Sequence, residues 1–232
     1  MVATLVASLV MSVSPDLYQS SIEPAERLGE QWWKDRHAAC QQITAKGEFD
    51  VAFLGDSITQ GWEGSGIAAW QKYFAPLKSA NFGFSGDRTQ HVLWRLSQGE
   101  LIAAKPKVVV MMIGTNNIGH GSSNAEQTAT GVKAIVAKIR KESPSTKILL
   151  LAIFPRAMEA NDPARIAVSQ ATDGFKTVAD EKMVFFRDIG KAFVNSDGSM
   201  RKSLMPDLLH LSDFGYELWG RQIVDDVKKL LK

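Results

Sequence analysis

The chain has 232 residues, a length that fits one α/β domain with no need of disulfides or metals to hold it together. Its 27 basic and 25 acidic residues leave a formal net charge of +2, which gives no electrostatic reason to expect a nucleic acid or an anionic membrane as partner. Cys40 is the only cysteine, so an intrachain disulfide is excluded.

The chain opens with an apolar stretch at residues 2–13, which is shorter than the ~20 residues of a membrane-spanning helix. The sequence therefore predicts no transmembrane segment. The same stretch leaves open a secretory signal remnant over residues 1–14. A signal peptide begins with basic residues, however, and the first basic residue here is Arg27. We expect a cytoplasmic protein, with a secreted or periplasmic one as the alternative.

Five short apolar runs predict the strands of a sheet. Each run is bounded by Gly, Pro, Asp or Lys, and each is too continuous for a strand with one wet face, as is typical of strands buried on both sides. The runs lie at 51–54, 80–82, 108–113, 148–154 and 183–186.

Segments with helical spacing of apolar residues surround these runs. They predict helices at 24–46, 88–96, 130–141, 163–182 and 212–231, the last with Ser212 as its N-cap. Strands that alternate with helices in this way predict an α/β fold with a parallel sheet and helices on both faces. The chain contains no linker, internal repeat or low-complexity tract, so we expect a single domain.

Three loops that follow predicted strands carry the polar and glycine residues of a candidate site. They read GDSIT at 55–59, GFSGD at 83–87 and GTNN at 114–117. In open α/β sheets, ligands bind beyond the carboxyl ends of the strands, where the strand order reverses. These loops are therefore the place to look for chemistry.

Ser57 follows the first strand at the start of a short helix, where it is either a nucleophile or an N-cap. A hydroxyl is a weak nucleophile unless a base takes its proton. His210 is the candidate base, because Asp207 lies three residues upstream and is placed to orient its imidazole. A local salt link is the alternative interpretation of that pair.

The chain has three other histidines, none of them a strong candidate for the base. We expect His37 to be solvated on a polar helix. His91 is equally compatible with a packing or surface position and with a pocket position. His120 is placed to line the pocket without acting as the base.

Acyl transfer also needs hydrogen-bond donors for the developing oxyanion. Gly86 offers a backbone N–H and Asn116 a side-chain amide, although turn geometry alone also explains residues of these types. A nucleophile, two donors and an oriented base from four loops at one sheet edge are unlikely to coincide by chance. The residues thus favour an esterase.

Four segments resemble, in the right order, the signature blocks of SGNH hydrolases, also called GDSL esterases and lipases. These are FLGDS at 53–57, NFGFSGD at 81–87, GTNN at 114–117 and DLLHL at 207–211. The stretches 81–101 and 194–198 are more similar still to the catalytic subunits of platelet-activating-factor acetylhydrolase Ib. The similarity extends from about residue 50 to the end of the chain.

This resemblance implies a flavodoxin-like, three-layer α/β/α sandwich with a five-stranded parallel sheet. It implies a catalytic triad of Ser57, His210 and Asp207 and an oxyanion hole of Ser57, Gly86 and Asn116. It also implies that residues 50–232 form one SGNH hydrolase domain and that residues 1–49 form an arm and a helix packed on it. The acetylhydrolase branch leaves a homodimer open. Asn117 stands where many members carry aspartate, which favours this branch.

Several alternatives remain. An α/β-hydrolase elbow requires Gly-x-Ser-x-Gly, and Thr59 stands in place of the last glycine. A nucleotide-binding module lacks its glycine motifs. A catalytically silent SGNH-fold binding module and a long-chain lipase or lysophospholipase stay open. No cofactor is predicted, and no metal, because no His or Cys group has ligand spacing.

The expected substrate is a small ester with a short acyl group, acetyl to about butyryl. The site loops hold few large aliphatic residues that could bury a longer chain. Trp62 and Trp70 are the nearest bulky residues after Ser57, and either belongs to the core or walls off a shallow acyl site. The alcohol half of the ester is not predicted.

Overall fold

The structure is a computed structural model that describes residues 21–232, so the apolar stretch at 2–13 lies outside the described residues. Within that range, five parallel strands form one sheet in the order β2-β1-β3-β4-β5. The strands are β1 (Val51–Gly55), β2 (Ser79–Gly83), β3 (Val108–Met112), β4 (Lys147–Leu151) and β5 (Val184–Arg187). The predicted five-stranded parallel sheet is confirmed.

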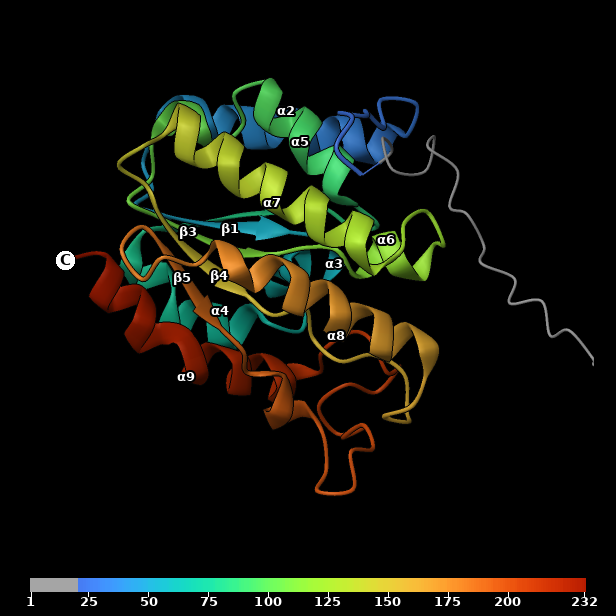
Figure 1. The fold of residues 1–232 in the computed structure, drawn as a ribbon. Coiled ribbons are helices and arrows are strands. Elements are labelled where there is room, and N and C mark those ends of the chain that lie inside the picture. The colour runs from blue at the N-terminus through green and yellow to red at the C-terminus, as the bar shows by residue number, and fades with distance from the viewer. Residues whose placement is uncertain (1–20) are drawn as a thin grey trace, which may run out of the picture.

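Helices cover both faces of this sheet and complete a three-layer α/β/α sandwich. Figure 1 shows α2, α5 and α7 along one face and α4 and α9 along the other, with α8 packed beside α7. The α-helices are α2 (Gln31–Lys46), α3 (Ser57–Gln60), α4 (Ile67–Tyr73), α5 (Thr89–Ser97), α6 (Thr115–Gly119), α7 (Ala125–Glu142), α8 (Pro163–Phe175) and α9 (Asp213–Leu230). Short 3-10 helices lie at Gly61–Glu63, Ala75–Leu77, Ile102–Ala104, Lys176–Val178 and Gly190–Phe193.

The core has two halves because successive side chains of a strand point to opposite faces of the sheet. In β1, Ala52 and Leu54 belong to the cluster under α2, α5, α7 and α8. Val51 and Phe53 belong to the cluster under α4 and α9. Both sets of side chains are fully buried, which is why the strand reads as a continuous apolar run.

Two predicted elements end several residues earlier in the structure than expected. The strand expected at 148–154 ends at Leu151, where the chain leaves the sheet although the next three residues remain buried. The helix expected at 163–182 ends at Phe175. Asp180 accepts hydrogen bonds from the backbone N–H groups of residues 182–184, and this turn directs the chain into β5.

The first and last helices differ in how well their starts were predicted. The helix expected at 24–46 begins only at Gln31, and the residues before it form turns. The closing helix begins as predicted, because the Ser212 hydroxyl accepts a 3.3 Å hydrogen bond from the Gly215 N–H.

Candidate active site

The site lies at the point where the strand order reverses. From β1 the chain goes to β2 on one side and then crosses to β3 on the other. The ends of these strands are level, since Gly55 pairs with both Gly83 and Met112. The three loops singled out in the sequence therefore leave the sheet side by side, at the place where α/β folds bind ligands.

Ser57 occupies the first position of α3, which turns back tightly over the end of β1. The Asp56 carboxylate caps the helix by accepting a 3.0 Å hydrogen bond from the Ile58 N–H. A Cβ at Gly55 would lie 2.5 Å from the Met112 carbonyl oxygen, so only glycine permits this close approach. Burial raises the pKa of Asp56 to about 7, which its bond to Ile58 offsets only in part.

The Ser57 hydroxyl lies 2.9 Å from Nε2 of His210, and Nδ1 of the same ring lies 2.7 Å from Oδ2 of Asp207. A carboxylate can only accept hydrogen bonds, so Nδ1 carries the proton and donates to Asp207. In the neutral ring, Nε2 is then the acceptor of the Ser57 hydroxyl proton. The structure thus brings together the three residues that the sequence selected.

A tight turn fixes the position of His210 relative to Asp207. Oδ1 of Asp207 accepts hydrogen bonds from the backbone N–H groups of Leu209, at 3.0 Å, and His210, at 2.7 Å. Partial burial acts to raise the pKa of Asp207. The bonds from His210 and Leu209 outweigh that effect and leave this pKa below its usual range. Asp207 therefore remains a carboxylate at neutral pH.

Gly86 and Asn116 come from different loops, and Asp87, the residue after Gly86, connects them. The Asn116 amide donates a 3.0 Å hydrogen bond to the Asp87 carbonyl, next to Gly86. That bond uses one of the two amide N–H groups. Gly86 has a φ of 73°, a left-handed conformation that favours glycine. Both predicted donors thus lie together beside the end of β1.

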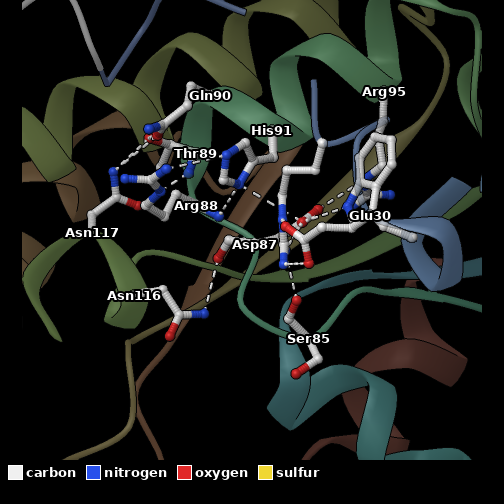
Figure 2. A network of polar contacts seen from close by, with 12 residues as sticks. Glu30, Ser85, Asp87, Arg88, Thr89, Gln90, His91, Arg95, Asn116 and Asn117 are labelled. Atoms are coloured by element: carbon white, nitrogen blue, oxygen red, sulfur yellow. Dashed lines mark hydrogen bonds and ion pairs between the residues drawn. The ribbon is translucent and has the colours of Figure 1, made fainter. Parts of the chain in front are cut away.

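A buried ionic network holds the loop that contains Gly86 (Figure 2). The Asp87 carboxylate accepts hydrogen bonds from Trp33 Nε1 at 2.8 Å, Arg95 Nε at 3.0 Å and Arg27 Nη1 at 3.0 Å. Arg27 also donates to the Ser85 carbonyl at 2.7 Å. Burial raises the pKa of Asp87, against the effect of these donors. Paired with two arginines, Asp87 ties the loop to the N-terminal segment.

Sequence reasoning missed Arg27 and Trp33 as residues that support the site. Both lie in the segment 21–49, outside the four signature blocks, and their partner Asp87 is more than fifty residues away. A second arginine of that segment, Arg36, donates a 2.6 Å hydrogen bond to the carbonyl of Gly83, at the end of β2. The available signal was weak: two arginines and two adjacent tryptophans in a largely polar segment without a motif.

The other histidines are not placed to serve Ser57. The prediction that His37 is solvated was wrong, because only 13% of its side chain is exposed and its Nδ1 lies 2.7 Å from the buried Glu100 carboxylate. His91 Nδ1 accepts a hydrogen bond from the Arg88 N–H. Burial, with help from nearby arginines, lowers the pKa of His91 to about 3 and keeps it neutral. His120 is exposed at the end of α6.

Asn117, the residue after Asn116, has a structural role. Its Oδ1 accepts a hydrogen bond from the Thr89 N–H at 3.0 Å, and its amide donates to the Thr89 hydroxyl at 3.0 Å. These bonds join α6 to the start of α5. The two asparagines therefore have different partners: Asn116 bonds to the loop that contains Gly86, and Asn117 bonds to the buried Thr89.

Two negative findings concern the described residues alone. Among residues 21–232, no group of three or more His, Cys, Asp and Glu side chains is placed to hold a metal ion. Of the helices in the same range, none combines the length and apolar character that crossing a bilayer requires.

Comparison with known sequences gives the family of this chain. The model of the GDSL-like lipase/acylhydrolase family matches residues 53–218. The chain is 39% identical to human platelet-activating factor acetylhydrolase IB subunit alpha1 over 189 residues, which cover 81% of this chain and 79% of that protein. It is 37% identical to the rat alpha2 subunit over 205 residues, or 88% and 87% of the two chains.

Solved structures share the fold at lower identity. A putative platelet activating factor protein from Streptococcus pneumonia has a TM-score of 0.66 at 22% identity and covers 87% of this chain and 97% of its own. An acetylxylan esterase from Geobacillus stearothermophilus has a TM-score of 0.62 at 20% identity, with 76% and 93% covered. With a five-stranded α/β/α sandwich and matching signature blocks, the chain belongs to the GDSL-like lipase/acylhydrolase family of SGNH hydrolases.

Proposed function

We propose that this hydrolase cleaves esters of short acyl groups, acetyl to about butyryl, with Ser57 as nucleophile, His210 as base and Asp207 as the residue that orients His210. The observation that carries the proposal is the continuous path from the Ser57 hydroxyl through His210 to Asp207, with distances of 2.9 and 2.7 Å. An activated serine needs such a base within hydrogen-bond reach.

In the proposed reaction, Ser57 Oγ attacks the ester carbonyl while its proton moves to His210 Nε2. The imidazolium that forms is stabilised by the Asp207 carboxylate. The carbonyl oxygen becomes an oxyanion, which accepts hydrogen bonds from the backbone N–H groups of Ser57 and Gly86 and from the Asn116 amide. His210 then protonates the leaving alcohol. Water, activated by the same imidazole, releases the acid from the acyl-enzyme.

The names of the relatives support a short acyl group, whereas the placement of two tryptophans rules out one expected form of its pocket. Trp62 and Trp70, the nearest bulky residues after Ser57 in the sequence, are 0% and 9% exposed and pack against Phe53 and Phe74 in the core. They are therefore not walls of an acyl pocket. The relatives at 37–39% identity are named as acetylhydrolases.

We expect kcat/KM for nitrophenyl esters to be highest at two to four acyl carbons and to fall beyond that. Each buried methylene contributes ~0.8 kcal/mol, so an enzyme with a long acyl groove would gain several-fold in kcat/KM per added carbon. The measurement is a series of esters from two to sixteen carbons, with Ser57→Ala as the blank. An optimum at eight carbons or more would overturn the short-acyl assignment in favour of a lipase.

We expect Asn116→Ala to lower kcat by roughly 10²–10³, or ~3–4 kcal/mol, with little change in KM. The reason is that the amide stabilises charge present only in the transition state. Steady-state kinetics with a nitrophenyl acetate substrate gives both constants.

Asn117→Ala is the matched control for this variant. It removes the partner of the buried Thr89 N–H, so we expect a loss of about 1–3 kcal/mol in the free energy of unfolding but a much smaller loss of kcat. Urea unfolding of both variants separates the two effects. If kcat falls equally in the two variants, Asn116 is a structural turn residue and not an oxyanion donor.

A further inference from the structure

The loop after β2 contains a β-turn of four residues, Phe84, Ser85, Gly86 and Asp87. The Asp87 N–H donates a 3.0 Å hydrogen bond to the Phe84 carbonyl and so closes the turn. Gly86, the third residue, has a φ of 73°, whereas the φ of Ser85, the second residue, is negative. This combination defines a type II turn.

The orientation of one peptide unit separates a type II turn from a type I turn. If the peptide between the second and third residues rotates by about 180°, the φ of the third residue changes from positive to negative, and the carbonyl and the N–H exchange directions. Glycine at the third position has no Cβ that would oppose either state. The peptide between Ser85 and Gly86 therefore has two accessible orientations, and a contact from outside the turn can select one of them.

Arg27 makes such a contact. Its Nη1 donates one hydrogen bond of 2.7 Å to the Ser85 carbonyl and another of 3.0 Å to Oδ1 of Asp87. Among residues 21–232, the Ser85 carbonyl has no other partner and the Gly86 N–H has none. The neighbouring peptides have partners of their own, because the Ser85 N–H donates to Gln60 Oε1 at 2.7 Å and the Asp87 N–H closes the turn. The orientation of the Ser85–Gly86 peptide thus depends on Arg27.

Arg27 is itself held in place on its other side. Its Nε and Nη2 each donate a 2.9 Å hydrogen bond to one oxygen of Glu30, and the guanidinium lies over the Trp32 ring, 5.2 Å from the ring centroid. A planar fork that is bonded on both sides has little freedom to rotate. Arg27 is therefore a rigid support for the turn.

The contact with Arg27 decides where the Gly86 N–H points. A trans peptide directs its N–H opposite to its C=O, and the described residues contain no cis peptide. With the Ser85 carbonyl bound to Arg27, the Gly86 N–H points away from Arg27 and is free to bond a substrate atom. A cation bound to the carbonyl also polarises the peptide, which makes its N–H a stronger donor. In the flipped orientation, a carbonyl oxygen would take the place of this donor and repel an oxyanion.

We propose that Arg27 is a positioning residue of the oxyanion hole, which locks the Ser85–Gly86 peptide in the type II orientation so that the Gly86 N–H faces the developing oxyanion. The inference rests on the proposed function for the role of Gly86, whereas the lock itself is a property of the turn. Loss of the contact lets the peptide flip, which replaces a donor by an acceptor and lowers the rate without any change in the triad.

The test is NMR of the full isotope-labelled chain, because the two turn types give different nuclear Overhauser contacts. In a type II turn, the Gly86 amide proton lies close to the Hα of Ser85, and in a type I turn it lies close to the Ser85 amide proton. We expect the first contact alone in the wild-type chain and the second contact to appear in Arg27→Lys. Lysine keeps a positive charge beside Asp87, but its nitrogen takes the place of arginine Cζ, one bond short of the Nη1 that reaches Ser85.

Steady-state kinetics on nitrophenyl acetate should show that kcat falls at least about tenfold in Arg27→Lys with little change in KM, because the Gly86 donor acts on charge present only in the transition state. Trp33→Phe is the matched control. Trp33 donates to the same oxygen as Arg27, Oδ1 of Asp87, at 2.8 Å, but it does not bond to Ser85. Trp33→Phe should therefore keep the type II contact and lose less of kcat than Arg27→Lys.

Melting curves show whether each variant is folded. Gly86→Ala provides a folded test even if Arg27→Lys is unstable, because it removes no bond of the Asp87 network. Alanine disfavours a φ of 73°, and its Cβ would lie 3.3 Å from Nη1 of Arg27, so the peptide should flip and kcat should fall to a similar extent. The type I contact with a wild-type kcat in this variant would overturn the proposal.

The remaining outcomes separate the lock from the proposed function. A folded Arg27→Lys that keeps the type II contact alone would refute the lock, whatever its rates. Equal flipping in Trp33→Phe and Arg27→Lys would also refute it, because the turn would then depend on Asp87 and not on the bond to Ser85. A flipped peptide in Arg27→Lys, in a protein whose wild-type chain hydrolyses no ester, would support the lock and refute the proposed function.

Discussion

Ser57→Ala is expected to lower ester hydrolysis by a factor on the order of 10⁴–10⁶, because it removes the atom that attacks the carbonyl. The fold should be unaffected. Among residues 21–232, the Ser57 hydroxyl has a hydrogen bond with His210 alone, and the cap of α3 is supplied by Asp56. Initial rates on nitrophenyl acetate and a thermal melt of the same preparation measure both expectations.

Ser85→Ala is the matched control, since Ser85 is an exposed serine in the neighbouring loop, next to Gly86. A fluorophosphonate probe should label the wild-type chain and Ser85→Ala but not Ser57→Ala, because it reacts only with an activated serine. The nucleophile is misassigned if Ser57→Ala keeps more than about a tenth of wild-type turnover. An unlabelled wild-type chain would instead indicate a catalytically silent binding module.

The strands and the candidate site could be predicted because their signals are local. A strand buried on both faces is a continuous apolar run, and β1 and β3 are read directly from theirs. The Asp207–His210 pair is also local, since one short turn holds both residues. Ser57 and His210 are far apart in the chain, and the prediction that they pair came from the resemblance to SGNH hydrolases more than from any spacing.

What could not be predicted depends on partners distant in the sequence. His37 has the polar helical neighbours of a solvated residue, yet Glu100 and the ring of Trp33 enclose it. Arg27 and Trp33 lie in a segment with no motif, and their place under the Gly86 loop follows from the buried Asp87 carboxylate. A buried charge needs compensation, but the sequence does not say which cation supplies it.

The ends of helices and strands were also predicted poorly, because they too depend on residues outside the segment. The apolar periodicity of α8 continues past Phe175, but the chain passes into a 3-10 turn at Lys176–Val178, and Asp180 then accepts the N–H groups of residues 182–184 at the start of β5. The side chain thus competes with the helix for the backbone donors. Such competition depends on where the next strand must begin, which is a property of the sheet and not of the segment.

His210→Ala is expected to lower kcat/KM by a factor on the order of 10⁶, about as much as Ser57→Ala, while Asp207→Asn should cost only about 10⁴. An asparagine at 207 can still accept the N–H groups of Leu209 and His210 through its amide oxygen. It would, however, present an N–H₂ group to Nδ1 of the imidazole. The ring would then favour the tautomer with the proton on Nε2, which cannot accept the Ser57 proton.

The double variant Ser57→Ala/His210→Ala gives the sharper test of this assignment. If the proton passes along the 2.9 Å contact between Ser57 and His210, the two residues act as a unit, and the double variant should lose no more than the larger single loss. Losses that multiply would mean that the residues act independently. Activity that survives in His210→Ala but disappears in His120→Ala would transfer the role of the base to His120.

Because the pKa of Asp207 lies below its usual range, its charge persists at mildly acidic pH. Asp207 should therefore still accept the hydrogen bond from Nδ1 of His210 at such pH, whereas Asp207→Asn loses this carboxylate at every pH.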